Sequence, residues 1–230
     1  MGRRGVTASP SRARARTRLV PVGLPVAADV ERVGILGGTF DPPHIGHLVV
    51  AQDAADALDL DLVLFVPAGI PPHKRERVIS AAEVRLAMTR AALGEEARFA
   101  ADDREMRRAG PSYTVDTLTE LRAEQPTAEL LLLVGADQYR ELHTWRRAGE
   151  IRRFCRVAVL ERGGRGQEPS VTDDVHIPVT RIDISGSDIR ARVGAGRSIR
   201  FLVTPAVDQI IRQHGLYQST AAAAKRERAP

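Results

Sequence analysis

The stretch Gly37-Gly38-Thr39-Phe40-Asp41-Pro42-Pro43-His44-Ile45-Gly46-His47 joins two segments of different pattern. It follows the short apolar run 33–36, which is typical of a buried strand, and it precedes residues 48–58, whose apolar side chains recur at helical spacing. A glycine turn between a strand and a helix lets backbone N–H groups approach an anion, and the positive end of the helix dipole faces that anion. The stretch therefore predicts a site for nucleotide phosphates within an α/β fold.

Strand-like and helical segments alternate along the rest of the chain. This alternation favours an α/β, Rossmann-like, doubly wound and mainly parallel sheet with helices on both faces, followed by a C-terminal helical segment. The expected strands are 32–36, 61–67, 97–101, 128–134, 155–160 and 175–179. The expected helices are 45–59, 81–93, 112–124, 137–153 in broken form, 186–194 and 203–214.

The two ends of the chain differ in composition from the part between them. Residues 1–28 contain six arginines and no acidic residue, and residues 221–230 are also basic. The net charge of +5 therefore comes from the ends, and the negative net charge of the part between them argues against a nucleic-acid partner. We expect a disordered basic leader over 1–28, a single folded domain over 29–218 and a disordered tail over 219–230. A transit peptide is the alternative for the leader.

The chain contains no apolar stretch of membrane-spanning length, and the leader lacks the apolar segment of a secretory signal. Cys155, the single cysteine, lies in an apolar run and is expected to be a buried strand residue in a reducing compartment. These features predict a cytoplasmic protein without a membrane partner.

A second motif, Ile184-Ser185-Gly186-Ser187-Asp188-Ile189-Arg190, opens the expected helix 186–194. Its serines are typical N-cap residues, and Arg190 lies one turn into the helix. A hydroxyl group, exposed N–H groups and a guanidinium at one helix N-terminus can bind an anion such as the outer phosphates of a triphosphate. Helix capping alone is the alternative for this motif and for His44 and His47. A zinc site is disfavoured because no cysteine or carboxylate stands at ligand spacing.

Three polar segments follow expected strands: 37–47, 67–74 and 135–137. Because ligands bind outside the carboxyl ends of parallel strands, we expect these segments to share one site.

Together, the GxFDPxHxGH turn and the ISxSxIR helix resemble the nucleotidyltransferase branch of the class I synthetase-like superfamily. Further segments resemble the bacterial nicotinate mononucleotide adenylyltransferases, over about residues 32–218. These segments are Pro71-Pro72-His73-Lys74, Gly110 to Leu118, Gly135-Ala136-Asp137, His143-Thr144-Trp145 and Ile210 to Tyr217. The chain departs from the family at Gly186, where a hydroxyl residue is more usual, so Ser187 must supply the hydroxyl group. It departs again in the short glycine-rich stretch after Arg162, a region of oligomer contacts in the family.

The resemblance implies transfer of the adenylyl group of ATP to nicotinate mononucleotide, giving deamido-NAD and pyrophosphate, with Mg²⁺ accompanying ATP. It implies two small-molecule partners and leaves homo-oligomer formation open. The catalytic residues would be His44, His47, Ser187 and Arg190. ATP would be bound by these four and by Gly37, Gly38, Thr39, Phe40, Gly135 and Asp137. The mononucleotide would be bound by Lys74, Tyr113, Thr114, Trp145 and Arg162.

Some of these assignments have structural alternatives. Lys74 could be a solvated loop residue, Asp137 a helix N-cap, and Trp145 a core side chain of an amphipathic helix. Alternative functions are a sibling adenylyltransferase for nicotinamide mononucleotide or pantetheine phosphate, and a nucleotide sensor without activity. An aminoacyl-tRNA synthetase is disfavoured by the short chain and by the lack of a KMSKS-like loop.

Overall fold

The computed structural model describes residues 30–71, 80–162 and 173–218. The expected leader 1–28, Lys74, the glycine-rich stretch after Arg162 and the expected tail 219–230 lie outside these residues.

Within the described residues, six strands form one sheet in which every neighbouring pair is parallel. The strands are β1 (Arg32–Gly38), β2 (Leu62–Pro67), β3 (Phe99–Ala101), β4 (Glu129–Gly135), β5 (Arg156–Arg162) and β6 (Val175–Val179). Their spatial order is β3-β2-β1-β4-β5-β6. The order reverses between β1 and β4, so the fold has its topological switch point at the carboxyl ends of these two strands.

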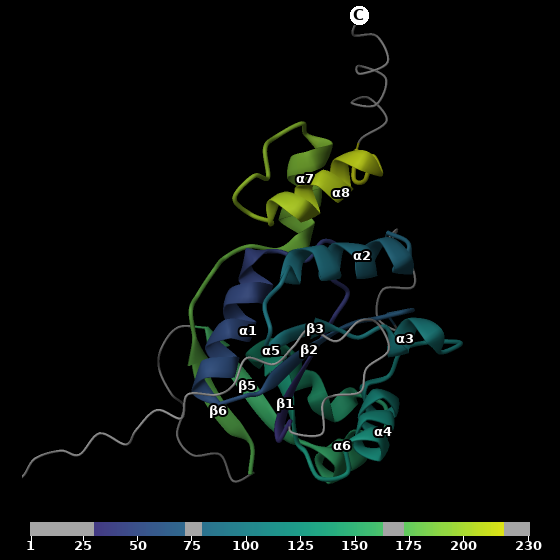
Figure 1. Cartoon of the computed structure of the whole chain (residues 1–230), viewed down its shortest axis with the longest axis vertical. Helices are drawn as coiled ribbons and strands as arrows, with labels where there is room; N and C mark the ends of the chain where they lie inside the picture. Colours follow the sequence, from purple (N-terminus) through teal and green to yellow (C-terminus); the bar gives the residue numbers. More distant parts are fainter. Residues whose placement is uncertain (1–29, 72–79, 163–172, 219–230) are drawn as a thin grey trace, which may run out of the picture.

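Helices cover both faces of the sheet, which confirms the doubly wound Rossmann-like fold (Figure 1). One face carries α1 (Ile45–Ala57) and α2 (Ala82–Leu93), and the other carries α4 (Thr114–Glu124) and α6 (Ala148–Phe154). Alternate strand residues enter the two cores because successive side chains of a strand point to opposite faces. Val33 and Ile35 pack under α4, whereas Leu36 packs with α1.

The C-terminal segment contains α7 (Gly186–Gly194) and α8 (Pro205–Gln213). Figure 1 shows both helices at one end of the molecule, beyond α2. Ile189, Val207 and Ile211 pack there against Met88 and Ala92 of α2 in a separate apolar cluster. The C-terminal segment therefore packs on α2, and it also contacts the start of α1, where the Ile45 N–H group donates to the Leu202 carbonyl at 2.9 Å.

The break expected within helix 137–153 is confirmed, and two other elements differ from expectation. The expected helix 137–153 is divided into α5 (Ala136–Glu141), the 3₁₀ turn η2 (Leu142–Thr144) and α6, since Arg147 has a left-handed backbone (φ +53°) just before α6. The expected helix 112–124 begins only at Thr114, because Tyr113 is extended. A one-turn helix, α3 (Arg104–Arg107), lies where none was expected, since one turn is too short to show apolar periodicity. Among the described residues, none of the helices is long and apolar enough to cross a membrane.

Candidate active site

Glycines leave open space at the switch point. A Cβ atom added at Gly37, near the end of β1, or at Gly135, the end of β4, would meet no described atom within 4 Å. Gly38 is different, because its Cβ atom would lie 2.9 Å from the buried ring of Phe40. The carboxyl ends of β1 and β4 thus border open space, so a ligand could come close to their backbone.

His44 and His47 stand at the N-terminus of α1, directly after this glycine turn. Their rings are stacked, with centroids 3.7 Å apart, and the His44 N–H group donates to Nδ1 of His47 at 3.2 Å. Nδ1 of His47 is therefore an acceptor, and a neutral ring carries its proton on Nε2. The alternative that the histidines are helix caps is therefore correct in part. His47 caps α1 through its Nδ1 atom, and its Nε2–H group remains a possible donor to a ligand.

The imidazole of His44 is uncharged at neutral pH. His44 is only 6% exposed, and the Nδ1 atom of its ring has no hydrogen-bond partner among the described residues. Burial, and then the positive charge of Arg162 at the end of β5, lower the pKa of His44 to about 4. Arg162 thus acts electrostatically on His44.

The second motif packs directly against the first. Ser185 is the N-cap of α7 and accepts the Asp188 N–H group at 3.1 Å, while Ser187 is exposed. The Arg190 guanidinium donates to the Asp41 carbonyl at 2.6 Å. A Cβ atom at Gly186 would lie 3.2 Å from the same carbonyl oxygen, so glycine suits this close approach. Both expected phosphate-binding motifs therefore meet at the loop after β1.

The Asp41 side chain anchors this loop, a contact that sequence reasoning missed. Its carboxylate accepts hydrogen bonds from the Tyr217 hydroxyl and from the Ser80 N–H group. Burial and the hydrogen bond to Asp41 raise the pKa of Tyr217, so its hydroxyl stays protonated as a donor. Asp41 lies in the opening motif and Tyr217 in a family-like terminal segment, but only the fold shows that they meet.

Tyr113 and Thr114 form the N-terminus of α4, on the other side of the expected site. Tyr113 is the N-cap and Thr114 the first helical residue, so the N–H groups of Thr114 and Val115 have no acceptor within the helix, whereas the Asp116 N–H group donates to the Tyr113 carbonyl at 3.0 Å. Arg146 lies over the Tyr113 ring at 4.5 Å. This helix start combines N–H donors with positive charge.

Trp145 follows η2 and is half-buried against the core under α4. The alternative for Trp145 was a core side chain of an amphipathic helix. Trp145 does pack on the core, but it lies after η2 and not within a helix.

Asp137 lies in the first turn of α5, with Gly135 at the N-cap, so the N-cap alternative for Asp137 is wrong. The exposed Asp137 carboxylate pairs with Arg140.

Phe40 is buried and meets the His47 ring edge-on at 5.0 Å, so only its backbone is available to a nucleotide. Thr39 contributes its carbonyl oxygen to a buried arginine, Arg85, that sequence reasoning also missed.

No group of three or more His, Cys, Asp or Glu side chains that could hold a metal ion is found in the part of the chain that the structure describes. Cys155 is buried, and burial raises the pKa of its thiol to about 12, which excludes a reactive thiolate.

Comparisons with known proteins agree with this arrangement. Residues 35–192 match the family model described as "Cytidylyltransferase-like". A protein of Shouchella clausii named "Probable nicotinate-nucleotide adenylyltransferase" is 42% identical over 189 residues, covering 82% of this chain and 97% of the relative. A protein of Thermomicrobium roseum with the same name is 44% identical over 202 residues, covering 84% and 94%.

The fold is also similar to that of Plasmodium falciparum nicotinic acid mononucleotide adenylyltransferase, whose structure was solved in complex with NaAD. The TM-score is 0.66 at 16% identity, covering 81% of this chain and 97% of the other. At this identity, the likeness concerns the fold alone.

Proposed function

The chain belongs to the cytidylyltransferase-like family and, within it, to the nicotinate-nucleotide adenylyltransferases, and we propose that its reaction is adenylyl transfer from ATP to nicotinate mononucleotide. The observation that carries the proposal is the meeting of the two phosphate-binding motifs at the switch point, where Arg190 donates to the Asp41 carbonyl. The products are deamido-NAD and pyrophosphate.

The chemistry suits a site that lacks a strong base. A phosphate oxygen of the mononucleotide attacks the α-phosphorus of ATP, one P–O bond forms, and the bond to the β-phosphate oxygen breaks. The departing pyrophosphate takes the electron pair. The attacking phosphate is already ionised at neutral pH, so catalysis needs positioning and charge stabilisation rather than proton removal.

We assign the charge stabilisation to residues at the two helix N-termini. His44 and His47 would hold the phosphates near the reacting phosphorus, and a neutral His47 donates from Nε2. Ser187 and Arg190 would hold the outer phosphates of ATP. Asp137 would accept a hydrogen bond from a ribose hydroxyl group.

ATP enters such a site with a divalent cation, for which we propose Mg²⁺. Mg²⁺ is commonly held by substrate phosphates with few protein ligands, which fits the lack of a metal-binding cluster among the described residues. The cation would neutralise charge on the triphosphate.

We assign the pyridine ring to Trp145 and the carboxylate to N–H groups at the start of α4, near Thr114. A carboxylate offers acceptors to these donors, whereas an amide presents its NH₂ group to them and leaves one donor unpaired. This difference supports a preference for the acid over the amide mononucleotide.

The test is a parallel assay of ATP with nicotinate mononucleotide, nicotinamide mononucleotide and pantetheine phosphate. We expect kcat/KM to be highest for nicotinate mononucleotide. Trp145→Ala should raise the KM for the mononucleotide by about 5- to 150-fold, corresponding to a stacking loss of roughly 1–3 kcal/mol, and should leave the KM for ATP nearly unchanged. Trp145→Phe, which keeps a ring, is the matched control.

Each alternative has its own signature in this assay. Equal efficiency with acid and amide would contradict the acid assignment, and preference for pantetheine phosphate would indicate a sibling enzyme. Nucleotide binding without turnover of any acceptor would indicate a sensor.

A further inference from the structure

We propose that Arg85 is a positioning residue that holds the phosphate-binding loop after β1 and the segment after β2 in fixed register, and so sets the spacing of the two substrates. The inference rests on the proposed function, which places ATP on the first of these loops and the mononucleotide beside the second.

Arg85 lies on α2 with only 1% of its surface exposed. Its guanidinium donates four hydrogen bonds, all to backbone carbonyls. Nη1 donates to Thr39 at 2.9 Å and to Ala68 at 2.6 Å, Nη2 donates to Gly69 at 2.9 Å, and Nε donates to Ser80 at 3.0 Å. One side chain therefore connects the loop after β1, the segment after β2 and the residues before α2.

The acceptors distinguish Arg85 from an ordinary buried ion pair. Among the described residues, no carboxylate accepts a hydrogen bond from its guanidinium. Burial is unfavourable for the charge and is the main reason why the pKa of Arg85 is lowered, while the nearby charges of Asp41 and Glu83 act in the opposite direction without forming a hydrogen bond to the guanidinium. The charge is thus used to fix backbone groups in place.

Fixing a carbonyl also fixes the N–H group of the same peptide, because the two point in opposite directions across a planar trans peptide. The Ala68–Gly69 peptide demonstrates this. Its carbonyl accepts from Arg85, and its N–H group donates to Oγ of Ser112 at 2.9 Å. In the same way, the bond to the Thr39 carbonyl directs the Phe40 N–H group of the phosphate-binding loop away from Arg85.

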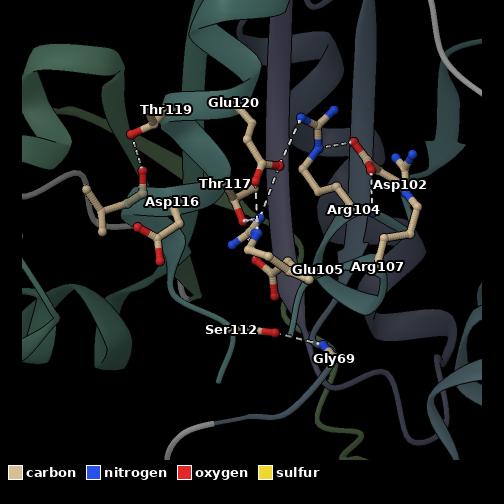
Figure 2. Close-up of polar contacts among 12 residues, drawn as sticks. Gly69, Asp102, Arg104, Glu105, Arg107, Ser112, Asp116, Thr117, Thr119 and Glu120 are labelled. Carbon is tan, nitrogen blue, oxygen red and sulfur yellow. Dashed lines mark hydrogen bonds and ion pairs between the residues drawn. The ribbon is translucent and has the colours of Figure 1, made fainter. Parts of the chain in front are cut away.

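Ser112 carries the connection to the start of α4. Figure 2 shows its hydroxyl facing Gly69, and its own N–H group donates to the Ile70 carbonyl at 3.0 Å. Gly69 has no room for a side chain, because a Cβ atom there would lie 2.3 Å from the Glu105 carbonyl oxygen. Ser112 is followed by Tyr113 and Thr114, the residues assigned to the mononucleotide.

A buried polar cluster holds α4 itself in place. Figure 2 shows Thr117 of α4 beside Glu105 of α3, to whose carboxylate it donates at 2.6 Å. Arg108 donates to the same Thr117 hydroxyl oxygen at 3.0 Å and pairs with Glu120. The contacts from Arg85 therefore reach the N-terminus of α4, a helix that the hydrogen bonds to Thr117 also hold in place.

Only arginine has the shape for this role. Its planar guanidinium carries donors in several fixed directions, whereas a lysine ammonium has three donors on one atom. Arg85→Lys keeps the positive charge but cannot reach all four carbonyls. Because small displacements of reacting groups strongly reduce rates, we expect Arg85→Lys to lower kcat by about 10- to 100-fold. The dissociation constant of each substrate alone should change by less than about 3-fold, because each half of the site stays intact.

The matched control is Met88→Ala, one turn further along α2. Met88 is fully buried in the C-terminal cluster and contacts neither loop through a hydrogen bond among the described residues. Its truncation lowers stability but should leave kcat nearly unchanged below the melting temperature. If Arg85→Lys is merely destabilising, it will resemble Met88→Ala in both measurements, and the proposal is then wrong.

A double variant tests the route of coupling. Ser112→Ala acts on the other side of the Ala68–Gly69 peptide, and it is a mild change that should fold. If Arg85 acts through this peptide, the loss of kcat in Arg85→Lys/Ser112→Ala will be smaller than the product of the single losses. Independent, multiplicative losses would contradict the route.

Amide hydrogen exchange provides a readout that does not depend on activity. We expect Arg85→Lys to accelerate exchange at Gly69 and Ser112 beyond the change in Met88→Ala. Unchanged exchange there would overturn the proposal even if the wild type showed no turnover. Conversely, absent wild-type turnover with accelerated exchange would contradict only the proposed function.

Discussion

The ring of His47 is fixed from two sides by the protein itself. Its Nδ1 atom accepts the His44 N–H group, and the Phe40 ring meets it edge-on. The donor Nε2–H group therefore has a set direction at the helix N-terminus. Such preorganised donors are most effective where charge develops in the transition state.

We expect His47→Ala to lower kcat by about 100-fold or more and to raise KM far less, because its interaction strengthens as charge moves to the leaving pyrophosphate. Steady-state kinetics with both substrates will measure this. Gln52→Ala, further along the same helix, removes only a hydrogen bond to Asp56 and should retain normal kcat. A folded His47→Ala variant with near-normal turnover would remove His47 from the mechanism.

His44 makes stability depend on pH. Its pKa is about 4 in the folded protein against 6.5 for an unperturbed histidine, so the unfolded chain binds the proton more tightly. This contribution is absent above about pH 7 and lowers stability as the pH falls through 6.5 toward 4. The expected loss is about 2 kcal/mol at pH 5 and about 3 kcal/mol near pH 4.

The measurement is chemical unfolding of the wild type and His44→Gln at pH 7.5 and pH 5. The wild type should lose about 2 kcal/mol more than the variant between these conditions. Equal losses in both proteins would show that His44 is not the group responsible.

At the scale of the element, α7 assigns different tasks to two serines. Ser185 caps the helix through Asp188 N–H and also donates to the Asp188 carboxylate at 2.7 Å. Ser187 is exposed beside Ser185. The sequence motif alone left capping and phosphate binding open for both residues.

We expect Ser185→Ala to lower the free energy of unfolding by about 1 kcal/mol through loss of the cap. Ser187→Ala should leave stability nearly unchanged and raise the KM for ATP. Denaturant unfolding and ATP kinetics on both variants will distinguish the two roles. If Ser187→Ala destabilises the protein and leaves ATP kinetics unchanged, Ser187 belongs to the cap instead.

The elements that sequence reasoning predicted best have local signals. The expected helix 186–194 has the bounds of α7, because its cap residues and its apolar spacing are both local. The start of α4 at Thr114 was missed because the N–H group of Ser112 is used by Ile70, which lies far away in sequence. The helix 137–153 was expected to be broken, but the position of the break before α6 depends on the left-handed backbone of Arg147, which no turn residue indicates.

At the scale of the whole molecule, the two motifs read from the sequence lie together at the loop after β1, but the sequence did not indicate what holds them there. His44, His47 and Arg190 belong to motifs that can be read directly from the chain. Arg85 and Tyr217 act through contacts to backbone or to Asp41 over many residues, and neither lies in a pattern that specifies such a partner. Long-range support of this kind becomes visible only in the fold.

The C-terminal segment is therefore expected to support the site. Val207 and Ile211 of α8 pack on α2, which carries Arg85, and Tyr217 reaches the Asp41 carboxylate in the phosphate-binding loop. Burial of two such aliphatic side chains contributes about 3–6 kcal/mol, a large part of the stability of a typical domain. Loss of this segment should affect both folding and activity.

Two truncations test this view together with the proposed domain limits. A protein lacking residues 1–28 and 219–230 should keep its melting temperature and kcat nearly unchanged, because the three apolar clusters lie within the described residues. A protein that ends at Val203 loses α8 and Tyr217 and should be unfolded or strongly destabilised. Tyr217→Phe separates the two effects, because it keeps the packing but removes the donor to Asp41. We expect this variant to lower kcat while leaving the melting temperature nearly unchanged. If Tyr217→Phe behaves like the wild type in kinetics and unfolding, the C-terminal segment supports the molecule through apolar packing alone.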